Sequence, residues 1–150
     1  MYSAAFVLSA EDAKPNFSGR WRMVKEESDF GGFTVPDIVV RVIDQRDPTM
    51  NIHTVQTVKQ KTTTNDVTYM TDGSMANNII NGKEATSKAF WDGNALVIRT
   101  NMKNSKGEDV VMEERYTLSD DGQTLTTTSS IRSESGGVDM KLVSRKEKVN

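Results

Sequence analysis

The sequence has 150 residues, which is enough for one domain with a sizeable core. Its 19 basic and 21 acidic residues give a net charge of -2 with no long basic run, so we expect no nucleic acid partner, which would need a concentrated basic face. The absence of cysteine excludes disulfides, thiol catalysis and thiolate metal sites. No apolar run approaches the ~20 residues that cross a bilayer, so we also expect no stable membrane insertion.

The first apolar run is "AAFVLSA", residues 4–10, and the polar "EDAKPN" follows it at once. Its small-x-small ending resembles a signal peptidase site. We therefore interpret residues 1–14 as a signal-peptide remnant or an N-terminal extension, ahead of a domain over residues 15–150, and predict a secreted or periplasmic protein. An ordinary apolar element that packs on the domain is the alternative, and a homo-oligomer formed through this segment is a further prediction.

The rest of the chain alternates apolar with polar residues, which is typical of strands, and short turn signals such as "TDGS", "DGN" and "SDDGQ" separate the runs. Ten strands are predicted, over residues 18–26, 37–46, 51–60, 66–71, 75–80, 83–91, 95–103, 108–118, 124–132 and 138–146. Because short turns join consecutive strands, neighbours should pair antiparallel as a meander. A sheet of this width curls and removes its edges by closing. We therefore predict an all-β fold, a single antiparallel up-and-down meander barrel of about eight to ten strands, wide enough for a partly polar cavity.

The first predicted strand begins with "NFSGRW", which resembles the Gly-x-Trp signature of the lipocalins and their calycin relatives. Together with "TDG", "WDGNALVI" and "YTLSDDGQTLT" it also resembles a group of small exported bacterial lipocalin-like proteins. In lipocalins the tryptophan packs across the closed end of the barrel under a basic side chain of the last strand. The resemblance therefore implies a structural plug made by Gly19, Trp21 and Arg145, with a cation–π contact.

The chain departs from the fatty-acid-binding proteins, which belong to the same superfamily. Those proteins hold a carboxylate with an Arg-x-Tyr arrangement, whereas Arg115 and Tyr116 are adjacent here and point to opposite faces of a strand. Only about ten residues, "SDFGGFTVPD", stand where that family inserts two helices. We therefore do not predict fatty-acid binding for this chain from its resemblance to that superfamily.

Candidate ligand-binding residues come from the loop and from the middle strands. Phe30 and Phe33 flank two glycines in a segment that would either cover the barrel mouth or simply pack on its edge. Trp91 ends a strand and is either a core anchor or a pocket wall. Three further side chains would fix a polar end of the ligand: Tyr69, Arg99 and Arg115.

Catalytic signals are few. His53 is the only histidine, so a His-rich metal site is excluded and we predict no metal and no cofactor. The weak catalytic candidates are His53 as a general base, Glu113 and Tyr116. Glu113 and Glu114 lie on opposite faces of their strand, so one of them would point inward beside an arginine or tyrosine, where burial would raise its pKa.

Two hypotheses on function follow. The first is binding of a small apolar or amphipathic molecule inside the barrel. The second is a small cofactor-free barrel enzyme, a hydrolase or isomerase, with His53 or an inward carboxylate as general base. The first is favoured because no acid–base pair stands out in the sequence.

Overall fold

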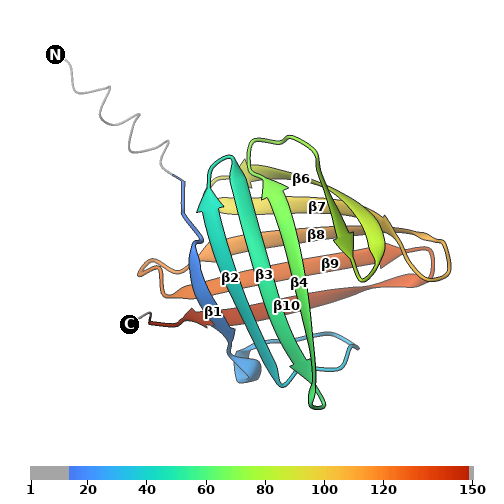
Figure 1. Ribbon diagram of the computed structural model, residues 1–150, viewed down its shortest axis with the longest axis horizontal. Coiled ribbons are helices and arrows are strands. Elements are labelled where there is room, and N and C mark those ends of the chain that lie inside the picture. The colour runs from blue at the N-terminus through green and yellow to red at the C-terminus, as the bar shows by residue number, and fades with distance from the viewer. Residues whose placement is uncertain (1–13, 149–150) are drawn as a thin grey trace.

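Ten antiparallel strands wind around one interior in this computed structural model, which describes residues 14–148 (Figure 1). The strands are β1 (Gly19–Met23), β2 (Ile38–Arg46), β3 (Thr49–Val58), β4 (Lys61–Met70), β5 (Ala76–Ile80), β6 (Lys83–Asp92), β7 (Ala95–Lys103), β8 (Asp109–Leu118), β9 (Thr124–Ser133) and β10 (Gly136–Lys146). One turn of 3-10 helix, η1 (Lys25–Glu27), follows β1. The apolar run over residues 4–10, interpreted above as part of a signal peptide, lies outside the described residues.

The strands form one sheet in the order β4-β3-β2-β1-β10-β9-β8-β7-β6-β5, so each strand pairs with its sequence neighbours and β1 also pairs with β10. The two ends of this order, β4 and β5, meet at a seam. There the Asn78 side chain bonds to the backbone of β4: Nδ2 donates to the Thr68 carbonyl and Oδ1 accepts from the Thr68 N–H, each at 2.9 Å. The result is a nearly closed meander barrel, as predicted.

The largest difference from the prediction is at β4, which begins at Lys61 and not at residue 66. Lys59 and Gln60 form the β3–β4 turn, with φ of 49° and 70°. Two successive positive φ angles are typical of a type I′ hairpin turn, which usually carries Asn-Gly. Lys-Gln is not a recognised turn pair, and the sequence analysis therefore did not predict this hairpin.

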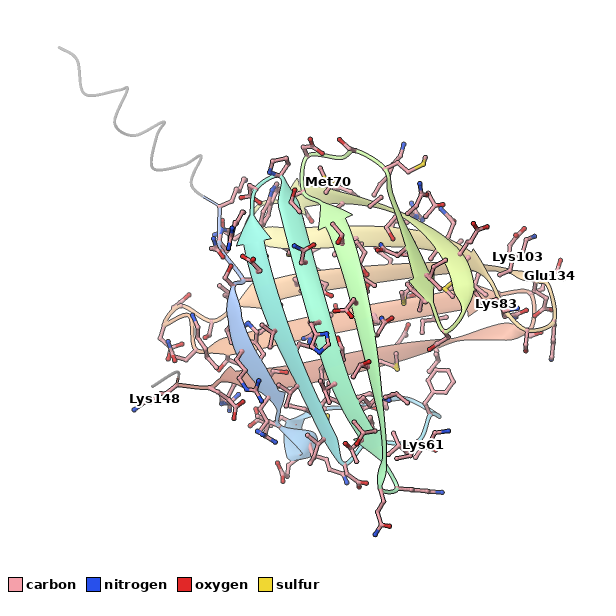
Figure 2. All side chains as sticks on the ribbon, in the orientation of Figure 1. Lys61, Met70, Lys83, Lys103, Glu134 and Lys148 are labelled. Atoms are coloured by element: carbon pink, nitrogen blue, oxygen red, sulfur yellow. The ribbon has the colours of Figure 1, made fainter. Side chains whose placement is uncertain are left out.

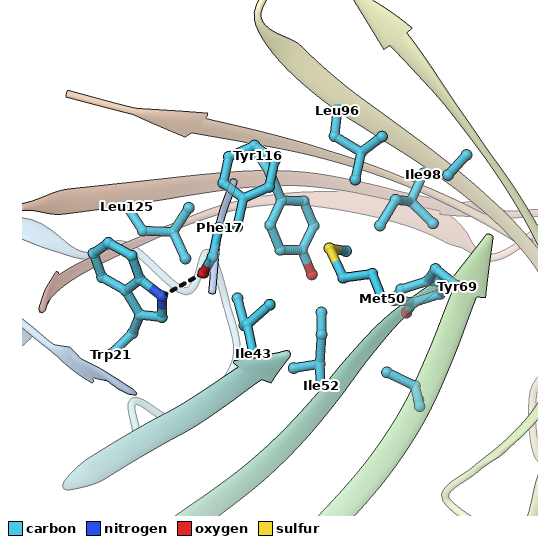
Figure 3. Packing of buried hydrophobic residues seen from close by; sticks show 12 residues of the cluster. Phe17, Trp21, Ile43, Met50, Ile52, Tyr69, Leu96, Ile98, Tyr116 and Leu125 are labelled. Carbon is cyan, nitrogen blue, oxygen red and sulfur yellow. Dashed lines mark hydrogen bonds between the residues drawn. The ribbon is translucent and has the colours of Figure 1, made fainter. Parts of the chain in front are cut away.

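The alternation of side chains along each strand sets an inner and an outer face. On β2 the inner face carries Val39, Arg41, Ile43 and Gln45, all buried. The apolar cluster of the interior is shown in Figure 3. Its buried members are Phe17, Trp21, Ile43, Met50, Ile52, Val67, Tyr69, Ala89, Leu96, Ile98, Tyr116 and Leu125.

The two ends of the barrel differ. The cluster fills the end at which β1 begins, which we call the closed end; the turns over residues 47–48, 71–75, 93–94 and 119–123 lie there. The other end, the open end, holds the β1–β2 segment and the turns over residues 59–60, 81–82, 104–108 and 134–135. Figure 2 labels Lys61, Lys83, Lys103 and Glu134 at the open end. Between residues 14 and 148, no helix is long and apolar enough to cross a membrane.

Candidate functional site in the barrel interior

Trp21 seals the closed end. The residue is 1% exposed, and its indole Nε1 donates to the Phe17 carbonyl at 2.9 Å (Figure 3). The Lys146 ammonium lies 5.6 Å from the ring centroid. Gly19 has φ of 147°, and a Cβ at this position would stand 2.8 Å from the Lys146 Cε. The glycine of the Gly-x-Trp motif therefore gives the lysine stem room to cross toward the indole.

The basic side chain over Trp21 is thus Lys146, and the expectation that it would be Arg145 is wrong by one residue. Trp21 stands opposite Lys146 in the β1–β10 ladder, and a shift of one residue turns a side chain to the other face. Arg145 points outward, where its Nη2 lies 2.9 Å from Glu27 Oε2.

Trp91 also belongs to the closed end. Its ring is half-buried and stacks on Phe17, with centroids 6.0 Å apart and an interplanar angle of 14°. The Lys14 ammonium lies 6.0 Å from the same ring and donates to the Gly93 carbonyl. Of the two interpretations of Trp91, its packing against the apolar cluster corresponds to the core anchor.

A polar cluster crosses the middle of the interior. Arg41 is 6% exposed; its Nη2 donates to Thr127 Oγ1 at 2.9 Å, and its guanidinium carbon lies 5.5 Å from the Tyr116 ring centroid. Glu114 is on the inner face of β8, two residues before Tyr116. Two atoms of this cluster are shielded from solvent yet find no hydrogen-bond partner among the described residues: Arg41 Nε and Glu114 Oε1.

The ionisable groups of the cluster change one another's pKa. Burial raises the pKa of the Glu114 carboxyl, while Arg41 and hydrogen bonding to Tyr116 oppose that rise. Burial likewise raises the pKa of the phenols of Tyr116 and Tyr69, and the negative charge of Glu114 adds to both shifts while Arg41 opposes them. These effects place all four groups within electrostatic range of one another.

The cluster stands where the interior changes from closed to accessible. On β8 the inward Tyr116 is buried, but the inward Glu114 and Met112 are only half-buried. On β10 the inward Ser144 is buried, but Leu142 and Met140 are half-buried. We call the part of the interior toward the open end, where these inward side chains are only half-buried, the accessible half; the polar cluster forms its floor.

A pocket of about 330 Å³ opens beside the seam between β4 and β5. Most of its wall is polar and belongs to the inner faces of β3 and β4, and Ile80 closes it from β5. Its lining residues are Thr54, Gln56, Thr63, Thr64, Asn65, Ile80 and Asn81. The accessible half thus offers hydrogen-bonding groups on this side of the barrel and methionine and aliphatic side chains on the β8–β10 side.

Several predicted site residues lie on the outer surface. Arg99 faces Glu113 across the β7–β8 ladder with 4.0 Å between Arg99 Nε and Glu113 Oε2, and Arg115 Nη2 lies 2.7 Å from Asp92 Oδ2. All four side chains are largely exposed. Neither arginine can therefore fix a ligand inside the barrel, and Glu113 is not the inward carboxylate.

His53 is also outside the barrel. It is exposed, and its Nδ1 lies 2.6 Å from Asp66 Oδ1 on the neighbouring strand. An enzyme acting inside the barrel would have to use Glu114 in place of His53. In the described part of the chain, no group of three or more His, Cys, Asp or Glu side chains is placed to hold a metal ion.

The β1–β2 loop lies along the open end. Asp29 pairs with Lys141 of β10 by two backbone hydrogen bonds of 2.7 and 2.8 Å. Gly31 has φ of 61° and packs so closely on Val138 that a Cβ would stand 2.3 Å from its Cγ2. The following Phe33 is 55% exposed, and Phe30 is half-buried. The loop is thus tied to β10 with one aromatic ring free at its tip.

The central residue of the cluster, Arg41, escaped the sequence interpretation. Its signal is the strand "IVVRVI", in which one charged side chain shares a face with Val39 and Ile43. An arginine between inward apolar neighbours at i-2 and i+2 must itself point inward. Tyr69 and Tyr116 are the two predicted site residues that the structure does bring into the cluster.

The nearly closed ten-strand meander, sealed by Trp21 at its closed end, has the fold of a calycin-like β-barrel. Solved structures with this fold include a secretory abundant heat soluble protein from Ramazzottius varieornatus (TM-score 0.62, 18% identity, 87% of this chain and 94% of that chain). They also include Caenorhabditis elegans lipid binding protein 8 (0.61, 14%, 87% and 95%) and a zebrafish ileal bile acid-binding protein complexed with cholic acid (0.57, 16%, 87% and 98%). No model of a protein family matches the sequence, and no curated protein matches it. At these identities the likeness establishes the fold alone.

Proposed function

We propose that this protein binds one small amphipathic molecule in the accessible half of the barrel, with the polar end of the molecule at Arg41 and its apolar body toward the open end. The observation that carries the proposal is the buried Arg41 side chain, whose Nε has no partner at the floor of the accessible half.

The energetics favour a ligand group at this position. A shielded donor without a hydrogen-bond partner costs about 1–3 kcal/mol, and more when the group is charged. A polar ligand atom that accepts from Arg41 Nε would recover part of this cost. The arginine is held for that role, because Thr127 and the Tyr116 ring fix its guanidinium.

The walls of the accessible half fit the rest of such a molecule. Met112, Met140 and Leu142 offer apolar surface beside the polar cluster, whereas Gln56 and Asn65 line the pocket at the seam. Methionine side chains adapt to ligands of different shape. A mixed wall of this kind suits an amphipathic molecule better than a pure hydrocarbon.

The structural neighbours support the same class of ligand. One is named as a lipid binding protein and another was solved with cholic acid, a molecule with an apolar body and polar groups. This support is an analogy of fold, and the interior residues carry the proposal.

The proposal also covers the location of the protein. The apolar run over residues 4–10 supports export, so that the protein would be secreted or periplasmic. It would then be of the bacterial lipocalin-like type with the Gly-x-Trp signature. As a second part of this proposal, the same segment joins copies of the chain in a homo-oligomer. Fractionation of cells that express the full chain tests the first part, and light scattering of the purified full chain beside a chain without residues 1–10 tests the second. Retention in the cytoplasm would contradict the first part, and a monomeric mass would contradict the second.

Binding itself is tested by titration with the neutral fluorescent probe N-phenyl-1-naphthylamine after solvent extraction of the purified protein, with mass spectrometry of the extract. The expected result is a saturable increase in fluorescence at one site per chain. Arg41→Met should change the affinity of amphiphiles that compete with the probe, and Arg99→Met, at an outer arginine, should not. Absence of saturable binding, or equal effects of the two variants, would overturn the proposal.

A further inference from the structure

We infer that the polar end of the ligand is a neutral group that both accepts and donates a hydrogen bond, an alcohol or a primary amide, and that Glu114 selects against a carboxylate. This inference rests on the proposed function and names the class of ligand for that site.

The two unpartnered atoms at the floor have opposite hydrogen-bonding character. Arg41 Nε carries a hydrogen and can only donate, whereas Glu114 Oε1 is an acceptor. A hydroxyl group accepts with its lone pairs and donates its one hydrogen, and a primary amide does both through its carbonyl and its NH₂. Either group therefore carries both the acceptor that Arg41 Nε lacks and the donor that Glu114 Oε1 lacks.

Arg41 and Glu114 do not satisfy one another in this arrangement. The Nη2 of Arg41 donates to Thr127, and the face of its guanidinium is turned to the Tyr116 ring. Glu114 lies on the inner face of β8, opposite Ser129 of β9 and Ile98 of β7. Its neighbours on the inner face are therefore one apolar side chain and one hydroxyl.

A carboxylate fits this floor poorly. Its oxygens would accept from Arg41, but at neutral pH it has no hydrogen to offer Glu114 and would bring a second negative charge beside it. The protein would then keep an unsatisfied oxygen that the alcohol or amide satisfies. Sites built for a hydroxyl or amino group reject ligands that leave their buried polar atoms unpaired.

Competition against N-phenyl-1-naphthylamine at pH 8 tests the inference. The competitors are dodecan-1-ol, dodecanamide and dodecanoate, which share one chain length; the first two are used below their solubility limits and dodecanoate below its micelle concentration. The alcohol and the amide should displace the fluorescent probe at concentrations about tenfold lower than dodecanoate, as expected for a hydrogen bond to a charged group. Glu114→Gln keeps an acceptor oxygen at nearly the same shape and removes the charge. This variant should bind dodecanoate about tenfold more tightly while its affinity for the alcohol changes by less than about threefold.

Glu113→Gln is the matched control, because Glu113 is the preceding residue and lies on the outer face. It should leave all three affinities unchanged. The inference is overturned if dodecanoate binds most tightly to the unmodified protein, or if Glu114→Gln does not improve its binding. These outcomes still leave the barrel as a binding protein, whereas failure of every molecule, including the fluorescent probe, to bind would overturn the proposed function as well.

Discussion

The guanidinium of Arg41 lies over the ring of Tyr116, 5.5 Å from its centroid, in the middle of the barrel. The two residues come from β2 and β8, strands that do not neighbour each other in the sheet, so this contact crosses the interior. It holds a buried cation at the boundary between the apolar cluster and the accessible half. Arg41, Glu114 and Tyr116 should therefore be coupled in stability as well as in binding.

A double-mutant cycle measures that coupling. Arg41→Met should destabilise the protein by about 1–3 kcal/mol, because Glu114 loses the cation that offsets its burial. In the Glu114→Gln background the same substitution should cost less, since no buried charge is left behind. Urea denaturation of the four proteins provides the free energies of unfolding, and additive values would show that the two groups do not interact.

The stability of the protein should also depend on the ionisation of Glu114. The pKa of this carboxyl is raised above its ordinary value of 4.5 in the folded state, so the folded protein holds the proton more tightly than the unfolded chain. The protonated carboxyl therefore adds to the free energy of unfolding below about pH 4.5, and this contribution is lost as the pH rises through the folded-state pKa.

Glu114→Gln removes this loss. The variant should match the unmodified protein in melting temperature near pH 4 and exceed it at neutral pH. Glu113→Gln, on the exposed face, should show no comparable gain at neutral pH. A melting temperature difference for Glu114→Gln that is constant from pH 4 to pH 8 would refute the raised pKa.

Substitutions at the end of β10 distinguish the two basic residues beside the plug. Lys146→Ala should destabilise the protein by about 0.5–2 kcal/mol, because it removes the cation and the aliphatic stem that cover Trp21. Arg145→Ala should cost about 0–1 kcal/mol, since it loses only an exposed ion pair with Glu27. Thermal unfolding followed by tryptophan fluorescence checks the order, and a larger effect of Arg145→Ala would contradict the assignment of Lys146.

Gly19→Ala should destabilise the protein by about 1–3 kcal/mol, because φ of 147° is strained for alanine and the new Cβ would meet the Lys146 stem. In the Lys146→Ala background the steric part disappears and only the backbone strain remains. The loss should then be smaller in urea unfolding. Equal losses in both backgrounds would show that Gly19 serves the backbone conformation alone.

The fold was accessible from the sequence because period-two alternation and short turns are local signals. They predicted the meander. They did not decide which face of each strand is inward, and the predicted ligand-binding residues Arg99 and Arg115 lie on the outer face. The β3–β4 hairpin escaped because its turn carries Lys59 and Gln60 at positive φ without a glycine or asparagine.

The site was less accessible, since it depends on which strand faces meet across the barrel. The opposite faces of Glu113 and Glu114 allowed one of them to point inward beside an arginine or tyrosine, but the candidate chosen was Glu113, and the inward residue is Glu114. The partner is Arg41, more than seventy residues earlier in the chain, and no local pattern links the two. The choice of Arg145 over Lys146 failed for a related reason: the register between the first and last strands decides which one faces Trp21.

Methyl NMR of the methionines tests the central claim most directly, because the protein carries its own reporters inside and outside the barrel. With ¹³C-methyl methionine, addition of decan-1-ol should shift the signals of Met112 and Met140, whose side chains line the accessible half, to saturation at one equivalent. The signal of Met75, 57% exposed on the surface, should not move. Saturable shifts at Met75 with none at Met112 and Met140 would place the ligand on the outer surface and contradict the account.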